Sequence, residues 1–289
     1  MTDPWAEPGY LRDVQYKTDE NLAARQSIYH YQHPRIDLAA RVLDLALSGL
    51  AGVAGAPSAA TVADVGCGNG MYLAELATRG FPGRVVGADL SIGMLAAARQ
   101  RLDRPLSLAL ACADATALPF PDGAADLTLA MHMLYHVPDP SAAVSELHRV
   151  TKPGGRVVIG LNGGDHLREL REVIASVRGA DHASVHERVT LDAGERLAAV
   201  AFTKVTRHDF AAELRVPTVE PLDEYVRSMS GTHHGADPDR LVAAVVSNLP
   251  RTADGSYRIT THAGCLICEV LKVTSPRAAA PRSGQPPAP

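Results

Sequence analysis

The sequence predicts an α/β fold built on a doubly wound parallel sheet. Between about 61 and 161, short apolar segments of strand length alternate with segments of helical length. The apolar segments are continuous, as expected for strands that helices cover on both faces. A glycine-rich turn, Gly66 to Gly70, joins the first strand to the first helix. Such turns are typical of the ligand-binding edge of these sheets.

The composition narrows the class of protein. The chain has 289 residues, of which 46% are hydrophobic, enough for a substantial core. Its net charge of −4 and its aromatic content of 4% argue against a nucleic-acid or anionic-membrane surface. Four cysteines are too few for a disulfide scaffold. Because no signal peptide and no long apolar run is visible, we expect a cytoplasmic protein that binds neither nucleic acid nor membrane.

Residues 1–55 are predicted to form a helical segment ahead of the sheet. A first helix runs from Asp19, a candidate N-cap, to Gln32. Pro34 interrupts the pattern, and a second helix continues to about Leu50. Trp5 is expected to lie in a mobile terminus.

The alternating region contributes five predicted strands and three helices. The strands are expected at 61–65, 84–88, 106–111, 126–131 and 156–161. The helices are expected at about 70–79, 92–102 and 141–150. Strand–helix alternation of this kind requires parallel strands joined by helical crossovers.

The pattern is looser after 165. We expect helices at 166–178, 222–230 and 238–248, and strands at 202–210 and 256–273. The tail at 274–289 is rich in proline and alanine and is expected to be disordered, because it cannot build a core.

The glycine-rich turn differs from a dinucleotide fingerprint, which reads G-x-G-x-x-G. Its third glycine comes one residue early, and Met71 stands where that fingerprint has glycine. Asp64 precedes the first glycine by two positions. A carboxylate there suits a ligand with an ammonium group better than one with a pyrophosphate. The alternative is a tight turn that binds no ligand.

Two further carboxylates follow strands of the same sheet. Asp89 ends the second strand, 19 residues after Gly70, where a carboxylate can accept both ribose hydroxyls. Asp114 follows the third strand and could face an adenine amine. Each alone is an ordinary loop residue. Together, at these spacings, they indicate a nucleoside site at the carboxyl edge of the sheet.

These motifs, with further matches at 86–95, 114–126, 134–139 and 152–155, resemble one family. It is the class I S-adenosylmethionine-dependent methyltransferases, in their small-molecule, ubiquinone-type (methyltransferase type 11) branch. The resemblance is dense over about 60–162. It implies a Rossmann-like sheet of seven strands, ordered 3-2-1-4-5-7-6 with one antiparallel strand. The methyltransferase domain would span 56–273, behind a lid at 1–55, with an insertion at about 211–250 that roofs the acceptor pocket.

The resemblance also implies S-adenosylmethionine as cofactor, with binding residues in three groups. The methionine part is lined by the first motif, at Asp64, Gly66, Gly68 and Gly70. The nucleoside is held at the next strand ends, by Asp89, Leu90, Met94, Asp114 and Ala115. The lid contributes Tyr16 and Arg25, and Arg25 would pair with the methionine carboxylate. The backbone near Met131 would lie next to the sulfonium.

Methyl transfer from a sulfonium needs alignment, a dry site and, for some acceptors, a base. His132 and His136 follow the fourth strand and are candidate bases, with structural packing as the alternative for each. Tyr29 shares a helix face with Arg25 and could meet the acceptor, unless this helix only covers the surface. We expect metal-independent transfer to carbon, nitrogen or oxygen of an aromatic or heteroaromatic natural-product intermediate.

Two other functions remain open at this point. A tRNA or RNA methyltransferase would share the first motif, and a non-catalytic module would bind the cofactor without an acceptor. The chain is expected to be a monomer or a homodimer. Gly93 departs from the family pattern and should weaken the start of its helix by about 1 kcal/mol. Cys265 and Cys268 are expected to be buried structural residues.

Overall fold

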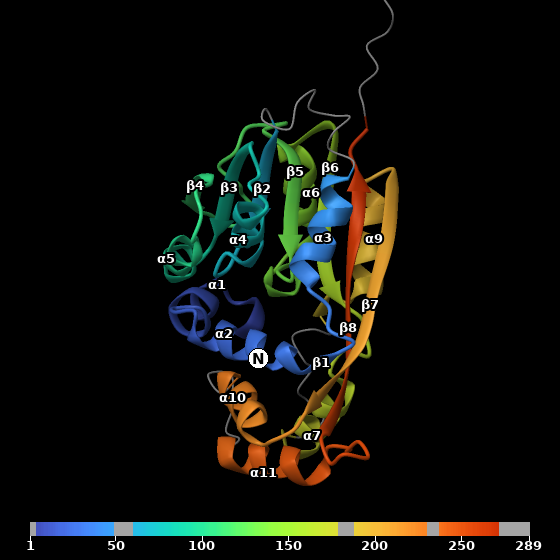
Figure 1. Ribbon diagram of the computed structural model, residues 1–289. Helices are drawn as coiled ribbons and strands as arrows, with labels where there is room; N and C mark the ends of the chain where they lie inside the picture. Colours follow the sequence, from blue (N-terminus) through green and yellow to red (C-terminus); the bar gives the residue numbers. More distant parts are fainter. Residues whose placement is uncertain (1–3, 49–59, 179–187, 230–236, 272–289) are drawn as a thin grey trace, which may run out of the picture.

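A computed structural model describes residues 4–48, 60–178, 188–229 and 237–271 (Figure 1). It contains one eight-stranded sheet in the order β1-β7-β8-β6-β5-β2-β3-β4. The strands are β1 (Gln32–His33), β2 (Thr61–Val65), β3 (Arg84–Asp89), β4 (Ser107–Cys112), β5 (Ala125–Met131), β6 (Thr151–Asn162), β7 (Lys204–Val216) and β8 (Tyr257–Glu269). Strands β4, β3, β2, β5 and β6 are parallel neighbours, and β8 lies antiparallel to both β6 and β7.

The α/β class and the order of the seven main strands are as predicted. The predicted count of seven is wrong by one, because β1 adds an edge strand that pairs antiparallel with β7. Gln32 lies opposite Leu214, and His33 lies opposite Glu213. The sequence pattern indicated helix as far as Gln32. The edge of β7 instead supplies hydrogen-bond partners for extended backbone there, and this contact depends on the tertiary fold.

The principal helices cover both faces of the sheet and its carboxyl edge (Figure 1). They are α1 (Pro8–Tyr10), α2 (Glu20–Ser27), α3 (Leu38–Leu47), α4 (Met71–Thr78), α5 (Ile92–Arg101), α6 (Pro140–Val150), α7 (Arg168–Arg178), α9 (Leu191–Ala201), α10 (Glu220–Ser228) and α11 (Pro238–Asn248). Short turns of other helix types occur at η1 (Pro4–Ala6), η2 (Leu11–Gln15), η3 (Ile28–Tyr31) and η6 (Leu134–His136).

Helix α9 was missed by the sequence pattern. Thr190 caps it, accepting a hydrogen bond from the Ala193 N–H, and Leu191 and Ala198 are fully buried. Gly194 lies in the helix interior, which lowers helix propensity. A Cβ atom at Gly194 would come within 2.1 Å of the Leu161 side chain. The glycine therefore lets α9 approach β6 closely, a reason that local propensity does not reveal.

Two hydrophobic clusters fill the opposite faces of the sheet. One combines α3, α4 and α5 with the strands, and the other combines α6 and α9. The second cluster includes Trp5, which is 9% exposed. The expectation that Trp5 lies in a mobile terminus is therefore wrong. Cys265 and Cys268 are buried, as predicted.

A third cluster joins α7, α10 and α11 beyond the carboxyl ends of the strands, and Ile28 of the N-terminal segment packs into it. Figure 1 shows these helices on the side of α2 away from the sheet. Strand β7 continues to Val216, so the segment between β7 and β8 starts later than the expected 211. The tail at 274–289 lies outside the described residues.

Gly93 has a role that the sequence pattern did not show. A Cβ atom there would lie 2.0 Å from the carbonyl oxygen of Lys17. The chain after η2 thus packs directly on the start of α5. Ser91 supports the same contact, since its hydroxyl donates to the Tyr16 carbonyl at 2.6 Å and caps α5 by accepting from the Met94 N–H.

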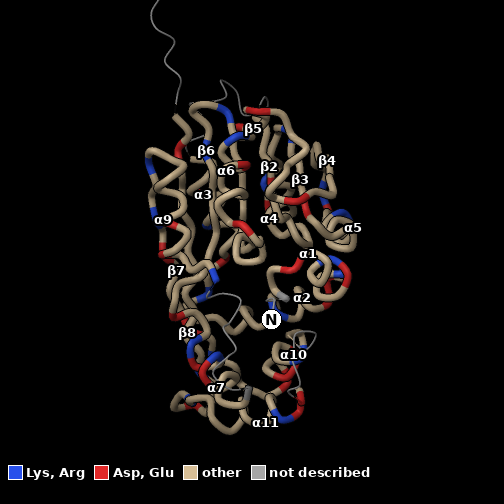
Figure 2. The backbone as a smooth tube through the Cα atoms, turned by 180° about the vertical axis from the view of Figure 1, so that it is seen from behind, with Lys and Arg blue, Asp and Glu red and all other residues tan. Residues whose placement is uncertain are grey.

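Charged residues are spread over the molecule. Figure 2 shows basic and acidic positions interspersed along the backbone, with both signs on the outer helices. None of the described helices is both long and apolar enough to cross a membrane.

Candidate active site

A cavity of about 650 Å³ lies at the carboxyl ends of β2, β3, β5 and β6. The N-terminal segment, from α1 through β1, covers it (Figure 1). Every predicted site residue except Gly70 lines this cavity. The fold therefore brings the strand-end residues and the N-terminal residues together around one space.

Gly70 does not line the cavity, and it packs against α5 instead. Its φ is +77°, and a Cβ atom there would lie 2.9 Å from both Cα and Cβ of Ala98 on α5. Gly66, in contrast, lines the cavity with φ +70°. A Cβ at Gly66 would lie 2.7 Å from Cβ of Met133. Both positions require glycine, for different reasons.

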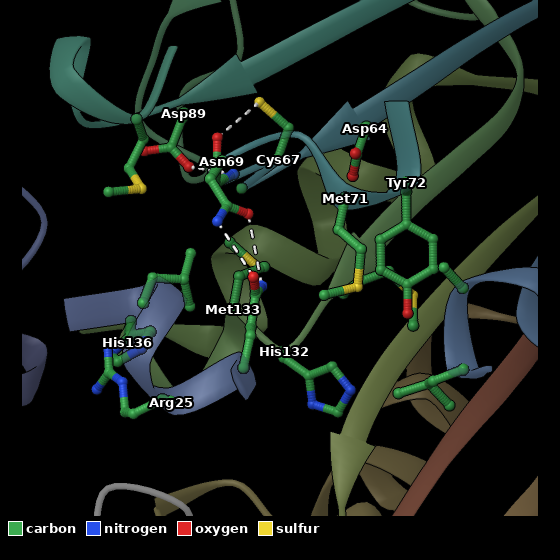
Figure 3. Close-up of a pocket in the computed structure, with 18 of the residues that line it drawn as sticks. Arg25, Asp64, Cys67, Asn69, Met71, Tyr72, Asp89, His132, Met133 and His136 are labelled. Atoms are coloured by element: carbon green, nitrogen blue, oxygen red, sulfur yellow. Dashed lines mark hydrogen bonds between the residues drawn. The ribbon is translucent and has the colours of Figure 1, made fainter. Parts of the chain in front are cut away.

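Asp64 places a buried carboxylate at the cavity. The residue is 1% exposed, and neither oxygen has a hydrogen-bond partner among the described residues. Burial raises the pKa of Asp64 to about 7, and the like charge of Asp89 adds to the rise. Figure 3 shows its carboxyl group at the wall of the cavity, above Met71. A buried carboxylate of this kind is costly unless a ligand supplies a donor or a cation.

Asp89 holds the glycine-rich turn in place. One carboxylate oxygen accepts from the Gly68 N–H and the other from the Ser91 N–H, each at 2.8 Å (Figure 3 shows the first). Burial raises the pKa of Asp89, and these hydrogen bonds oppose the rise. The backbone N–H of Leu90 also bonds to this carboxylate. Because a carboxylate has about four acceptor positions, about one remains for a ligand. Asp114 similarly orders its own turn, since its Oδ1 accepts from the backbone N–H and hydroxyl of Thr116.

Arg25 presents a buried cation to the cavity. Its guanidinium carbon lies 5.6 Å from the ring centre of Trp5 and 5.3 Å from that of Tyr16, distances typical of cation–π contacts. Its Nη2 is buried and has no hydrogen-bond partner within the described part of the chain. Such a donor suits an anionic group on a ligand.

His136 is engaged inside the protein through both ring nitrogens. Its Nδ1 lies 3.2 Å from the Trp5 carbonyl oxygen, which can only accept, so Nδ1 carries the proton. Its Nε2 then accepts from the Tyr16 hydroxyl at 2.8 Å. Burial, reinforced by the positive charge of Arg25, lowers the pKa of His136 to about 3. The geometry favours a role for His136 in fixing Tyr16 and the N-terminal segment.

His132, unlike His136, is not fixed by hydrogen bonds through both ring nitrogens. Its Nε2 is buried and has no partner among the residues described, and burial lowers its pKa to about 4. Its backbone has φ +54°, a left-handed conformation that costs a non-glycine residue about 1–3 kcal/mol. Figure 3 shows its ring on the side of the cavity toward which the Tyr72 hydroxyl points. His132 is therefore a neutral imidazole, held under strain, with one nitrogen available to a ligand.

Sequence reasoning missed many residues of this cavity, among them Tyr72 and His166. Tyr72, on the first turn of α4, is 6% exposed, and its hydroxyl has no partner in the described ranges. His166, between β6 and α7, forms a 3.0 Å hydrogen bond with Tyr29. Neither stands in a recognisable motif, and only their lining of the cavity marks them.

A charged cluster lies behind His166. His262 on β8 places Nδ1 2.6 Å from Asp165 and Nε2 2.7 Å from Asp209. Partial burial lowers the pKa of His262, but hydrogen bonds to Asp209 and Asp165 outweigh burial, and the pKa is raised. Arg207 also contacts Asp209, at 2.9 Å. The cluster ties the β6–α7 connection to β7 and β8.

We expect this cluster to stabilise the protein most between about pH 4 and about pH 6.5, where His262 is protonated and Asp165 and Asp209 are ionised. Because the folded-state pKa of His262 lies above 6.5, the contribution of His262 is lost as pH rises through the folded-state value. The urea midpoint of the wild type should fall between about pH 6 and about pH 9. The fall should be smaller in His262→Gln. An equal fall in both proteins would show that other groups cause it.

The described residues contain no group of three or more His, Cys, Asp or Glu side chains placed to hold a metal ion.

The central part of the chain is similar to one family of known proteins. Residues 63–159 match the family described as "Methyltransferase domain". The chain is 34% identical over 169 residues to an uncharacterized 37.1 kDa protein in transposon TN4556 of Streptomyces fradiae, covering 57% of this chain and 46% of that protein. It is 32% identical over 173 residues to malonyl-[acyl-carrier protein] O-methyltransferase of Serratia marcescens, covering 59% and 63%. The chain thus spans only about half to three-fifths of these relatives.

The fold has solved counterparts. A crystal structure of a candidate methyltransferase from Bacillus halodurans superimposes with a TM-score of 0.54 and 17% identity. The match covers 78% of this chain and 99% of that protein. At this identity, the likeness concerns the fold alone.

Proposed function

We propose that this chain, which belongs to the class I S-adenosylmethionine-dependent methyltransferases of the small-molecule type, transfers a methyl group from that cofactor to a small-molecule acceptor. One observation carries the proposal beyond family membership. Among the described residues, the buried carboxylate oxygens of Asp64 and the buried Nη2 of Arg25 lack hydrogen-bond partners, and both residues line the cavity. A zwitterionic amino-acid moiety satisfies both.

The residues present fit this cofactor. Asp64 would hold the ammonium group and Arg25 the carboxylate of the methionine part. Asp89 would accept from a ribose hydroxyl with its remaining lone pair, while Leu90, Met94 and Ala115 line the cavity with apolar surface for the adenine. We assign the lid to residues 1–55 and the methyltransferase domain to 56–273.

The cofactor, when bound, supplies a methyl group that is already activated on a sulfonium. The chain orients the acceptor, excludes water and moves one proton. We assign the base to His132, whose Nε2 would take the proton from the attacking O–H or N–H. The acceptor atom becomes strongly acidic as it bonds to the methyl carbon. An imidazole with a pKa of about 4 therefore suffices, and it is neutral before transfer at neutral pH.

The acceptor class is inferred from the cavity. Tyr29, Tyr135, Phe210 and Tyr225 line it, beside the neutral imidazole of His132. This combination suits an aromatic or heteroaromatic molecule with an ionisable O–H or N–H. The named relatives do not assign the acceptor, because the chain covers only part of their length.

Calorimetry tests the cofactor assignment. S-adenosylhomocysteine should bind to the full chain, and NAD should not bind measurably, because Asp64 repels a pyrophosphate. Tighter binding of NAD would contradict the assignment. Methyl transfer is then tested with labelled S-adenosylmethionine and neutral phenols and indoles. Cofactor binding without transfer to any acceptor would favour a non-catalytic module.

We expect Asp89→Ala to weaken S-adenosylhomocysteine binding by about 1–3 kcal/mol, the cost of lost charge-assisted hydrogen bonds. Part of this loss would come from the glycine-rich turn, since the Gly68 N–H loses its partner. Asp103→Ala, at an exposed position, is the matched control. Equal dissociation constants for the two variants would mean that Asp89 does not serve the ribose.

A further inference from the structure

The hydrogen bond between Tyr29 and His166 has a direction that the structure determines. The backbone N–H of His262 donates to His166 Nδ1 at 3.0 Å, so Nδ1 carries no proton. A neutral His166 then carries its proton on Nε2. The 3.0 Å contact between Nε2 and the Tyr29 oxygen is therefore a bond in which His166 donates. The hydroxyl hydrogen of Tyr29 is not used in that bond.

The backbone next to His166 is strained. The next residue, Leu167, has φ +53° although its side chain is 2% exposed. His132 and Leu167 are the two non-glycine residues with positive φ in the described ranges. One carries the proposed base, and the other follows the histidine that contacts Tyr29. Strain of this kind persists where the surrounding packing enforces it and is frequent at functional sites.

The His262 backbone, which determines the proton position on His166, is itself fixed. Its N–H lies on β8, and its ring is held between Asp165 and Asp209. Gly163 leaves room for that ring, because a Cβ there would lie 2.3 Å from His262 Nδ1. The Gly163 N–H also donates to the His262 carbonyl at 2.8 Å.

The second tyrosine–histidine pair of the cavity has the opposite direction. Tyr16 donates its hydroxyl hydrogen to His136, whose own proton is directed at the Trp5 carbonyl. Tyr16 therefore has no hydrogen left for a ligand. Burial raises the pKa of Tyr29 well above its usual value, so Tyr29 remains protonated and able to donate.

We propose that His166 is a positioning residue that directs the Tyr29 hydroxyl into the cavity, where it donates a hydrogen bond to a lone-pair oxygen of the acceptor. Because His132 would take a proton from the acceptor and Tyr29 would give a hydrogen bond to it, the acceptor class is a neutral aromatic molecule with both a hydroxyl and a carbonyl oxygen. This inference rests on the proposed methyl transfer.

Nitrogen-15 NMR of the histidine side chains tests the hydrogen-bond directions without any acceptor. In the full chain bound to S-adenosylhomocysteine, His166 should show the Nε2–H tautomer and His136 the Nδ1–H tautomer. The variants His166→Gln and His136→Gln assign the two signals. The Nδ1–H tautomer at His166, or an imidazolium there, would overturn the proposal.

A matched pair of acceptors tests the acceptor class. With 2-hydroxyacetophenone and 2-ethylphenol as probes, the wild type should prefer the ketone by about 10-fold in kcat/KM, the effect of one net hydrogen bond. Tyr29→Phe should abolish the preference. Methylation of both probes without preference would refute this inference and leave methyl transfer intact. Methylation of neither, with cofactor still bound, would refute the acceptor class.

Variants of His166 separate positioning from mere packing. His166→Leu should raise KM for the ketone by about 10-fold and change kcat less. His166→Gln retains an N–H donor near the Nε2 position and should recover most of the loss. The dissociation constant for S-adenosylhomocysteine should stay within about 2-fold in both variants. Equal loss in both, or a parallel loss of cofactor affinity, would indicate a structural role only.

Discussion

Asp64→Asn is expected to stabilise the protein without cofactor and to weaken cofactor binding. The pKa of Asp64 rises from 3.8 to about 7 on folding, because the carboxylate is buried and has no hydrogen-bond partner among the described residues. At about 1.4 kcal/mol per pKa unit, this rise corresponds to a penalty of about 4 kcal/mol above pH 7. An amide at this position carries no such penalty, so urea unfolding at pH 8 should show a gain of about 2–4 kcal/mol.

The same pKa difference predicts how the free energy of unfolding changes with pH. The folded pKa lies above the unfolded one, so the folded state binds the extra proton between pH 3.8 and about 7. The contribution of Asp64 to stability is therefore lost as pH rises through that interval and is constant above it. Asp64→Asn should lack this component. A variant that is less stable than the wild type at pH 8 would show that Asp64 has a stabilising partner in the protein.

Binding should change in the opposite direction. A ligand ammonium group would ionise Asp64, so S-adenosylhomocysteine affinity should increase as pH rises to about 7, with release of protons. Calorimetry in two buffers of different ionisation enthalpy measures this release. Asp64→Asn should bind at least about 100-fold more weakly, because a buried charge pair is broken. Asp103→Asn is the surface control, and unchanged affinity in Asp64→Asn would place the ammonium elsewhere.

His132→Asn is expected to lower kcat by about 100-fold to 10,000-fold, the usual contribution of a general base. Asparagine tolerates the left-handed backbone at this position, so the variant should fold. Cofactor affinity should stay within about 2-fold, because the assigned cofactor contacts lie on other residues. Steady-state kinetics on an accepted phenol, together with calorimetry, measure both quantities.

Two further variants test whether the loss of kcat comes from the imidazole of His132. His132→Gly should also lower kcat, yet stabilise the fold by up to about 1 kcal/mol, since glycine adopts positive φ without strain. His148→Asn, on α6 and outside the cavity lining, should leave kcat unchanged. A kcat for His132→Asn close to that of the wild type would mean that transfer needs no base at this position.

The amino-acid sequence alone was enough to predict the layered α/β fold and the edge of the sheet at which the cavity lies. Strand β2 was predicted with its observed bounds, and Asp64 and Asp89 were recognised as strand-end carboxylates. These features are encoded locally. Continuous apolar runs define buried parallel strands, and the spacing of glycines defines the turn that follows.

Only the tertiary structure decided which of these side chains can act on a ligand. Tyr16 and His136 are 120 positions apart and satisfy each other, whereas Tyr29 meets His166 across 137 positions. The same separation explains why β1, the buried Trp5 and the contact between Gly93 and Lys17 were not predicted. Sequence periodicity reports which face of an element is buried. It does not report which distant group covers that face, and hydrogen-bond direction and pKa depend on that group.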